Sequence, residues 1–174
     1  IHLSAPPPPV TILLSSNPAT PPRAGPPGTR ATGSGVEGRG GRRMTVENRT
    51  PDEAWDALRA GGAELVDVRT RAEWTFVGLP DLTEAGARVH CVEWKRWPDM
   101  AVDPRFVDHV LESLGGRTPE TLLFICRSGV RSMEAAMTVE AALAADGRDV
   151  ACVNVAEGFE GDLDAHGRRG AVNG

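Results

Sequence analysis

A cysteine that is followed closely by two arginines comes after a hydrophobic run in the second half of the chain. Residues 121–125 read Thr-Leu-Leu-Phe-Ile, and Cys126, Arg127, Gly129 and Arg131 come directly after them. The thiolate form of a cysteine is stabilised by loop N–H groups, by the positive end of a helix dipole and by neighbouring guanidinium groups. We therefore predict that Cys126 is a nucleophile. The alternative, an inert buried cysteine, is disfavoured by the two arginines.

A strand and a helix are expected to position this cysteine. The run from Thr121 to Ile125 is uncharged and aliphatic, which is typical of a buried strand. An Ala-rich helix is predicted from Arg131 or Ser132 to Ala145. The backbone N–H groups of residues 128–132 can then converge as an anion cradle at the helix N-terminus, and Gly129 permits the tight curl.

A second block lies 59 residues before the cysteine, counted from Asp67 to Cys126. Residues 65–74 read Leu-Val-Asp-Val-Arg-Thr-Arg-Ala-Glu-Trp, which predicts a strand over 64–69 and a short helix over 71–76. The carboxyl ends of parallel strands meet at one edge of a sheet, so both blocks are expected there. We interpret Asp67 as an acceptor for loop amides, and Arg69 and Glu73 as a local ion pair that positions the loop.

These two blocks together resemble the rhodanese (sulfurtransferase) family over roughly residues 47–160. The resemblance implies an α/β fold, rhodanese-like, with a central parallel sheet and helices on both faces. It implies that Cys126 takes the sulfane sulfur of a donor such as thiosulfate as a persulfide. The sulfur then passes to a thiol or cyanide acceptor, and a protein acceptor is possible. No cofactor or metal is implied. The substrate-binding residues it implies are Arg127, Ser128, Gly129, Val130, Arg131 and Ser132, with the two arginines on the donor's sulfonate.

The chain departs from the common family pattern after the first block. Many members continue with Gly-His-Ile-Pro-Gly-Ala, whereas this chain has Gly78-Leu79-Pro80-Asp81-Leu82 and then a longer segment containing Trp94 and Trp97. This segment either shapes a pocket for an organic thiol or a protein partner, or packs onto the domain. Packing is the favoured interpretation.

Two other functions remain open. One is a non-catalytic rhodanese-like module that carries sulfur or binds a partner, which the presence of Cys126 disfavours. The other is a cysteine phosphatase or arsenate reductase. Phosphatase loops of this architecture need five residues between Cys and Arg, whereas four separate Cys126 from Arg131 here.

The remaining elements alternate between helix and strand. A capped helix is predicted from Thr50 to Ala60, a helix from Pro104 to Leu114, and strands over 88–93 and 150–155. This alternation predicts a parallel sheet. The acidic run over 157–164 lacks the spacing of a calcium loop and is interpreted as a solvated loop.

Composition divides the chain of 174 residues in two. Residues 1–43 hold nine Pro, seven Gly, five Arg and one acid, which predicts disorder. Because Met44 begins a well-formed domain, we interpret the segment as untranslated upstream sequence. A genuine Arg- and Pro-rich extension or transit peptide is the competing interpretation. Residues 44–174 hold 14 basic and 23 acidic residues, which argues against nucleic acid or an anionic membrane as partner.

Cysteine usage bounds the compartment and the metal chemistry. Cys91, Cys126 and Cys152 have no metal-ligand spacing. An odd count with one reactive candidate suits a reducing, cytoplasmic compartment. Cys91 and Cys152 lie in strand-like runs and are predicted to be core residues. A minority interpretation has one of them form a disulfide with Cys126. No segment has the length of about 20 apolar residues needed to span a membrane.

Overall fold

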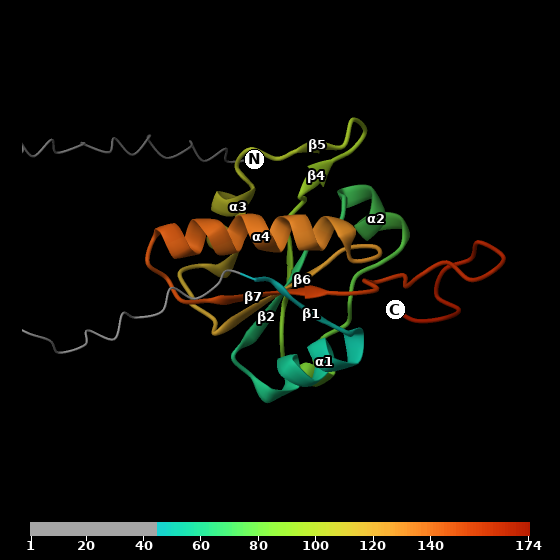
Figure 1. Cartoon of the computed structure of the whole chain (residues 1–174), viewed down its shortest axis with the longest axis horizontal. Helices are drawn as coiled ribbons and strands as arrows, with labels where there is room; N and C mark the ends of the chain where they lie inside the picture. Colours follow the sequence, from blue (N-terminus) through green and yellow to red (C-terminus); the bar gives the residue numbers. More distant parts are fainter. Residues whose placement is uncertain (1–44) are drawn as a thin grey trace, which may run out of the picture. The chain divides into compact units, whose positions relative to one another are not determined.

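The structure, a computed structural model, describes residues 45–174 (Figure 1). The predicted tail over residues 1–43, and Met44, lie outside the described residues. The helices are α1 (Pro51–Ala60), α2 (Arg71–Phe76), α3 (Phe106–Leu114) and α4 (Val130–Ala145), with a 3₁₀ turn η1 (Thr83–Ala85). The strands are β1 (Glu47–Arg49), β2 (Ala63–Asp67), β3 (Val89–Cys91), β4 (Lys95–Arg96), β5 (Ala101–Val102), β6 (Thr121–Ile125) and β7 (Ala151–Val155). No helix within the described residues is both long enough and apolar enough to cross a membrane.

Five parallel strands form the main sheet in the order β1-β7-β6-β2-β3. The side chains of α3 and α4, including Phe106 and Val139, pack on one face. Ala54 and Leu58 of α1 pack on the other face. Figure 1 shows α4 and α1 on opposite sides of the sheet. The predicted fold class, a parallel sheet with helices on both faces, is therefore confirmed.

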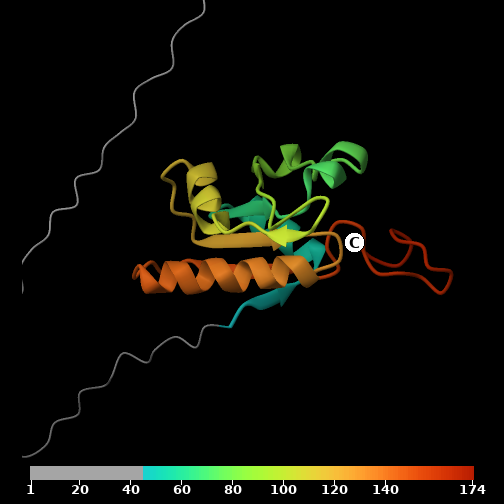
Figure 2. The ribbon, with the colours of Figure 1, turned by 90° about the horizontal axis from the view of Figure 1, so that it is seen from above.

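The register brings the two sequence blocks to the same edge of the sheet. Asp67 at the end of β2 pairs with Ile125 at the end of β6, and Val68 N–H donates to the Ile125 carbonyl at 2.9 Å. Cys126 follows immediately. The segment after β7 curls back at this edge beside the loop that precedes α4 (Figure 2). The carboxyl ends of β2, β6 and β7 thus surround the cysteine.

Local signals define two helix starts with the same chemistry. Thr50 and Glu53 form a capping box at α1, and Thr70 and Glu73 form one at α2. In each box the Thr hydroxyl accepts the backbone N–H of the Glu, and the Glu carboxylate accepts the backbone N–H of the Thr. The cap fixes α2 directly after β2, next to the cysteine loop.

The structure corrects several details of the sequence predictions. The strand predicted over 64–69 ends at Asp67, and the one predicted over 88–93 covers only Val89–Cys91. Strand β1 was not predicted, and neither was the antiparallel hairpin of β4 and β5. Cys91 is exposed at the end of β3 rather than in the core, because β3 is the edge strand of the sheet. Cys152 is buried as predicted, and burial raises the pKa of its thiol to about 12.

Candidate active site

The Cys126 sulfur lies at the carboxyl end of β6 and receives two hydrogen bonds. The Gly129 backbone N–H and the Ser132 hydroxyl each donate to Sγ at 3.2 Å. The Cys126 residue is 1% exposed and Ser132 is fully buried. Gly129 has φ 90°, a left-handed conformation that turns its N–H back toward the sulfur. A sulfur anion at this position is therefore stabilised by fixed donors and needs no metal ion.

The loop after β7 supports the cysteine loop from outside the helix. Phe159 N–H donates to the Cys126 carbonyl at 2.8 Å, and Glu160 N–H donates to the Arg127 carbonyl at 3.0 Å. At Gly158, with φ 70°, a Cβ would lie 2.6 Å from the Cys126 carbonyl oxygen and from the Ser128 nitrogen. Only glycine allows the two backbones to approach this closely.

Asp67 and Arg69 form a buried pair below the site. The Arg69 Nη2 donates to Asp67 Oδ2 at 2.7 Å, and the Arg69 backbone N–H donates to Oδ1 at 3.0 Å. Both residues are fully buried. The Arg69 guanidinium also donates to the Gly78 carbonyl at 2.8 Å and lies 4.0 Å from the centre of the Phe159 ring. Asp67 thus accepts a loop amide as predicted, and the pair joins the β2 loop to the loop after β7.

Arg131 and Glu73 form a second ion pair, across 58 residues of sequence. Arg131 Nη1 donates to Glu73 Oε2 at 2.9 Å and Nη2 to Oε1 at 2.5 Å. Burial disfavours the Glu73 carboxylate, but the hydrogen bonds from Arg131 and Thr70 outweigh it and lower the pKa to about 2. The predicted local ion pair between Arg69 and Glu73 is wrong: Arg69 turns inward to Asp67, and Glu73 reaches the helix that follows the cysteine loop.

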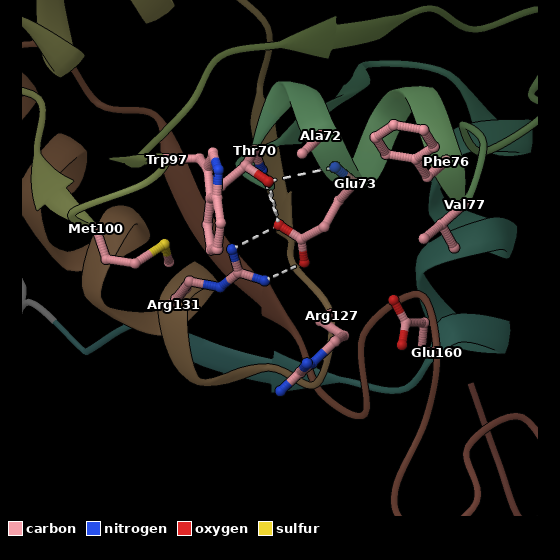
Figure 3. A pocket seen from close by; sticks show the side chains of 10 residues that line it. All are labelled: Thr70, Ala72, Glu73, Phe76, Val77, Trp97, Met100, Arg127, Arg131 and Glu160. Atoms are coloured by element: carbon pink, nitrogen blue, oxygen red, sulfur yellow. Dashed lines mark hydrogen bonds and ion pairs between the residues drawn. The ribbon is translucent and has the colours of Figure 1, made fainter.

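A pocket of about 480 Å³ opens beside the cysteine loop (Figure 3). Arg127 and Arg131 line it from the loop, and Glu73 lines it from α2. No hydrogen bond or ion pair engages the Arg127 guanidinium among residues 45–174, and Figure 3 shows it away from the Glu73–Arg131 pair. Four exposed hydrophobic side chains line its apolar part, namely Phe76 and Val77 at the end of α2, and Trp97 and Met100 in the hairpin.

No protein-family model matches the chain. Uncharacterized protein RC0915 of Rickettsia conorii is 34% identical over 120 residues, which are 68% of this chain and 88% of that protein. Uncharacterized protein RP600 of Rickettsia prowazekii is 31% identical over the same lengths. The crystal structure of Rv0390 from M. tuberculosis is 41% identical and matches with a TM-score of 0.59, over 74% of this chain and 90% of that one. A rhodanese-like domain protein from Staphylococcus aureus is 22% identical, with a TM-score of 0.41, over 72% of this chain and 95% of that one.

The chain belongs to the family of the Rickettsia proteins and Rv0390. Its fold is a sheet of five parallel strands with helices on both faces, and a cysteine loop follows β6.

The candidate site brings most of the predicted residues together, but they take different positions in it. Cys126, Gly129 and Ser132 form the sulfur cradle. Ser128 is half-buried in the loop, and Val130, on the first turn of α4, is 68% exposed. Arg127 lines the pocket, whereas Arg131 is held by Glu73 rather than facing outward as a free cation. The structure leaves the roles of these residues in substrate binding as predictions.

Sequence reasoning missed the residues of the candidate site that lie beyond the two blocks. Gly158, Phe159 and Glu160 follow β7, and their only sequence signal is a glycine beside an aromatic residue after the last strand. The two tryptophans of the longer segment have different roles. Trp94 is buried edge-to-face against Phe106, which fits the packing interpretation, whereas Trp97 is 68% exposed at the pocket.

Proposed function

We propose that this protein is a sulfurtransferase in which Cys126 carries sulfane sulfur as a persulfide. The observation that carries the proposal is the pair of donors on Sγ, from Gly129 N–H and Ser132 Oγ, each at 3.2 Å. A cysteine so placed attacks the outer sulfur of a donor such as thiosulfate. The donor's S–S bond breaks, sulfite leaves with the bonding electron pair, and Cys126 holds the persulfide anion.

The same cradle supports the second half of the reaction. A thiol or cyanide attacks the outer sulfur of the persulfide, and the Cys126 thiolate is restored as leaving group. Both the thiolate and the persulfide are anions, so fixed N–H and O–H donors stabilise each of them. Only the outer sulfur atom has to reach the buried Cys126.

The size of the loop supports sulfur rather than phosphate as the transferred group. Four residues separate Cys126 from Arg131, and the Arg131 guanidinium is already engaged by Glu73. A tetrahedral phosphate needs a wider ring of N–H groups and a free guanidinium. A single sulfur atom needs neither.

Intact mass measurement tests the proposal. After incubation with thiosulfate, the wild-type chain is expected to gain the mass of one sulfur atom and to lose it on addition of cyanide. Cys126→Ser is expected to gain none, whereas Cys91→Ser should still be modified. A folded wild-type chain that remains unmodified by thiosulfate and by organic sulfane donors would reject the proposal in favour of a binding module.

A further inference from the structure

The hairpin of β4 and β5 holds two apolar side chains at the pocket. Trp97 and Met100 lie in its turn, and Met100 N–H donates to the Arg96 carbonyl at 2.8 Å. The base of the hairpin is fixed to the domain at Trp94, whose Nε1 donates to Glu134 at 3.1 Å, and at Lys95, which pairs with the same carboxylate at 2.8 Å. These contacts hold the base of the hairpin against α4, and with it the turn that carries Trp97 and Met100.

Helix α2 supplies the opposite side. Phe76 is 87% exposed at its end and Val77 follows, and both line the same pocket as Trp97 and Met100. In Figure 3 the two pairs lie on either side of the Glu73–Arg131 pair. We call these four residues, Phe76, Val77, Trp97 and Met100, the apolar rim. Exposed apolar side chains gathered around a concave site indicate a ligand with an apolar body.

The charges of the pocket indicate how much negative charge that ligand carries. Arg127 and Arg131 are balanced by Glu73 and Glu160, so the four charged lining residues sum to zero. Arg131 is already paired with Glu73. The side chains of Arg127 and Glu160 have no hydrogen-bond or ion-pair partner within the described residues. The pocket therefore offers one free cation, Arg127, and also holds one free carboxylate, Glu160, so a ligand with a single negative charge suits it better than thiosulfate with two.

We propose that the sulfur donor is a monoanionic organic sulfane compound with an aromatic or branched aliphatic body. This inference rests on the proposed function. The body contacts the apolar rim, and the anionic group binds Arg127. For a thiosulfonate R–SO₂–S⁻, the Cys126 thiolate attacks the terminal sulfur, the S–S bond breaks, and the sulfinate R–SO₂⁻ leaves with the bonding pair. An organic persulfide R–S–S⁻ reacts likewise and releases R–S⁻.

The pocket's size favours a small molecule over a macromolecule. Its volume of about 480 Å³ lies in the range of small-molecule sites, which is about 300–1,000 Å³. A second copy of the chain or another protein seated on the rim is the competing occupant, and it is an outcome of the test below.

A pair of donors that differ only in their body provides the kinetic test. Benzenethiosulfonate and methanethiosulfonate both carry one negative charge. For the full chain, kcat/KM with each donor is divided by that donor's rate with free cysteine, which removes the difference in intrinsic reactivity. We expect the normalised value to be roughly tenfold to hundredfold higher for the phenyl donor. Trp97→Ala should lower that ratio at least several-fold. Met137→Ala removes an exposed side chain on α4 that does not line the pocket, and should preserve the ratio.

A binding measurement separates this inference from the proposed function. The Cys126→Ser variant cannot transfer sulfur, so it allows binding alone to be measured. Benzenesulfinate is titrated into it, and binding is followed by the change in tryptophan fluorescence. We expect it to bind at least tenfold more tightly than methanesulfinate, with weaker binding in Trp97→Ala and in Arg127→Ala. If no donor modifies Cys126 while this preference holds, the sulfurtransferase proposal fails and the ligand class stands.

Two results would overturn the inference. One is equal normalised kcat/KM for the phenyl and methyl donors in a chain that does form the persulfide. The other is a chain that sediments as a dimer which Trp97→Ala dissociates, together with no phenyl preference. The rim would then be an interface between copies and not a donor site.

Discussion

Arg131, on the first turn of α4, donates two hydrogen bonds to Glu73 of α2, at 2.9 and 2.5 Å. The same carboxylate accepts the Thr70 backbone N–H at 2.9 Å and completes the capping box of α2. One side chain therefore joins the start of α2 to the helix that follows the nucleophile. This arrangement links the stability of α2 to the position of the cysteine loop.

The Glu73–Arg131 pair predicts that the free energy of unfolding falls at acid pH. The pKa of Glu73 is about 2 in the folded chain, below its ordinary value of 4.5. A lowered carboxylate pKa contributes stability that is complete above about pH 4.5 and is lost as the pH falls toward 2. We expect Glu73→Gln to lower the free energy of unfolding by about 2–3 kcal/mol at pH 7, and by little near pH 2. Urea unfolding across this pH range measures the difference.

The chain provides a matched control for this variant. Glu53 occupies the same capping-box position in α1, is exposed, and has no arginine partner among the described residues. Glu53→Gln should cost only the few tenths of a kcal/mol to about 1 kcal/mol of an exposed cap. Equal losses for both variants at pH 7 would mean that Arg131 contributes nothing to the effect.

The ion pairs show where sequence reasoning stops. Arg69 and Glu73 are four residues apart, so a local pair was the natural expectation. The capping box instead directs Glu73 toward its own helix start, and burial of Arg69 against Asp67 leaves Glu73 for Arg131. Tertiary packing decides which of several cations a carboxylate pairs with, so the partner cannot be predicted from short-range spacing in the sequence.

The fold itself was predictable from the hydrophobic pattern and from the residues that begin and end helices and turns. Strand β6 and helix α2 have the predicted bounds, because an uncharged aliphatic run and a Thr-x-x-Glu cap are strong local signals. Strand β1 and the β4–β5 hairpin were missed, since strands of only two or three residues are too short to show a periodicity. Two residues of the apolar rim lie in that hairpin. From the sequence, a place at the pocket was therefore only one of two interpretations of this segment, the other being packing onto the domain.

The close approach at Gly158 predicts a severe effect of a single methyl group. In Gly158→Ala the Cβ would lie 2.6 Å from the backbone of the cysteine loop, so one of the two loops must move. We expect a loss of about 2–4 kcal/mol in unfolding free energy and at least a tenfold loss of sulfur transfer. Differential scanning calorimetry and a thiosulfate assay measure the two effects.

Gly167 separates the steric cause from backbone strain. It has φ 74°, close to the 70° of Gly158, but nothing lies within 4 Å of the position of its Cβ. Gly167→Ala should therefore cost only the strain of about 1 kcal/mol and leave sulfur transfer intact. If both variants lose stability equally and keep activity, contact between the two loops does not hold the cysteine loop.

The Ser132 hydroxyl predicts a moderate catalytic effect. Ser132→Ala removes one of the two donors on the Cys126 sulfur and leaves the Gly129 N–H in place. Loss of one hydrogen bond to a charged group should lower kcat/KM for thiosulfate roughly tenfold to hundredfold. Ser113→Ala is the control, because its hydroxyl donates to the Val110 carbonyl within α3 and lines no part of the site. Similar kinetics for Ser132→Ala and wild type would remove the hydroxyl from the cradle.

The two arginines of the loop should separate into a binding role and a positioning role. Arg127 is exposed and has no partner within residues 45–174, so Arg127→Ala should leave the unfolding free energy within about 0.5 kcal/mol of wild type. It should raise KM for an anionic donor roughly tenfold to hundredfold, because the one unengaged cation of the pocket is lost. Arg131→Ala instead leaves the partly buried Glu73 carboxylate without its partner, and should cost about 1–3 kcal/mol of stability.

A double-mutant cycle tests that division. Adding Glu73→Gln to Arg131→Ala removes the orphaned charge, so the double variant should be less unstable than the sum of the single variants predicts. Thiosulfate kinetics on all four chains then show whether activity follows stability. Suppose instead that Arg127→Ala leaves KM unchanged, while Arg131→Ala raises KM without loss of stability. The donor would then displace Glu73 and bind Arg131, and the assignment of Arg127 as the anion site would be wrong.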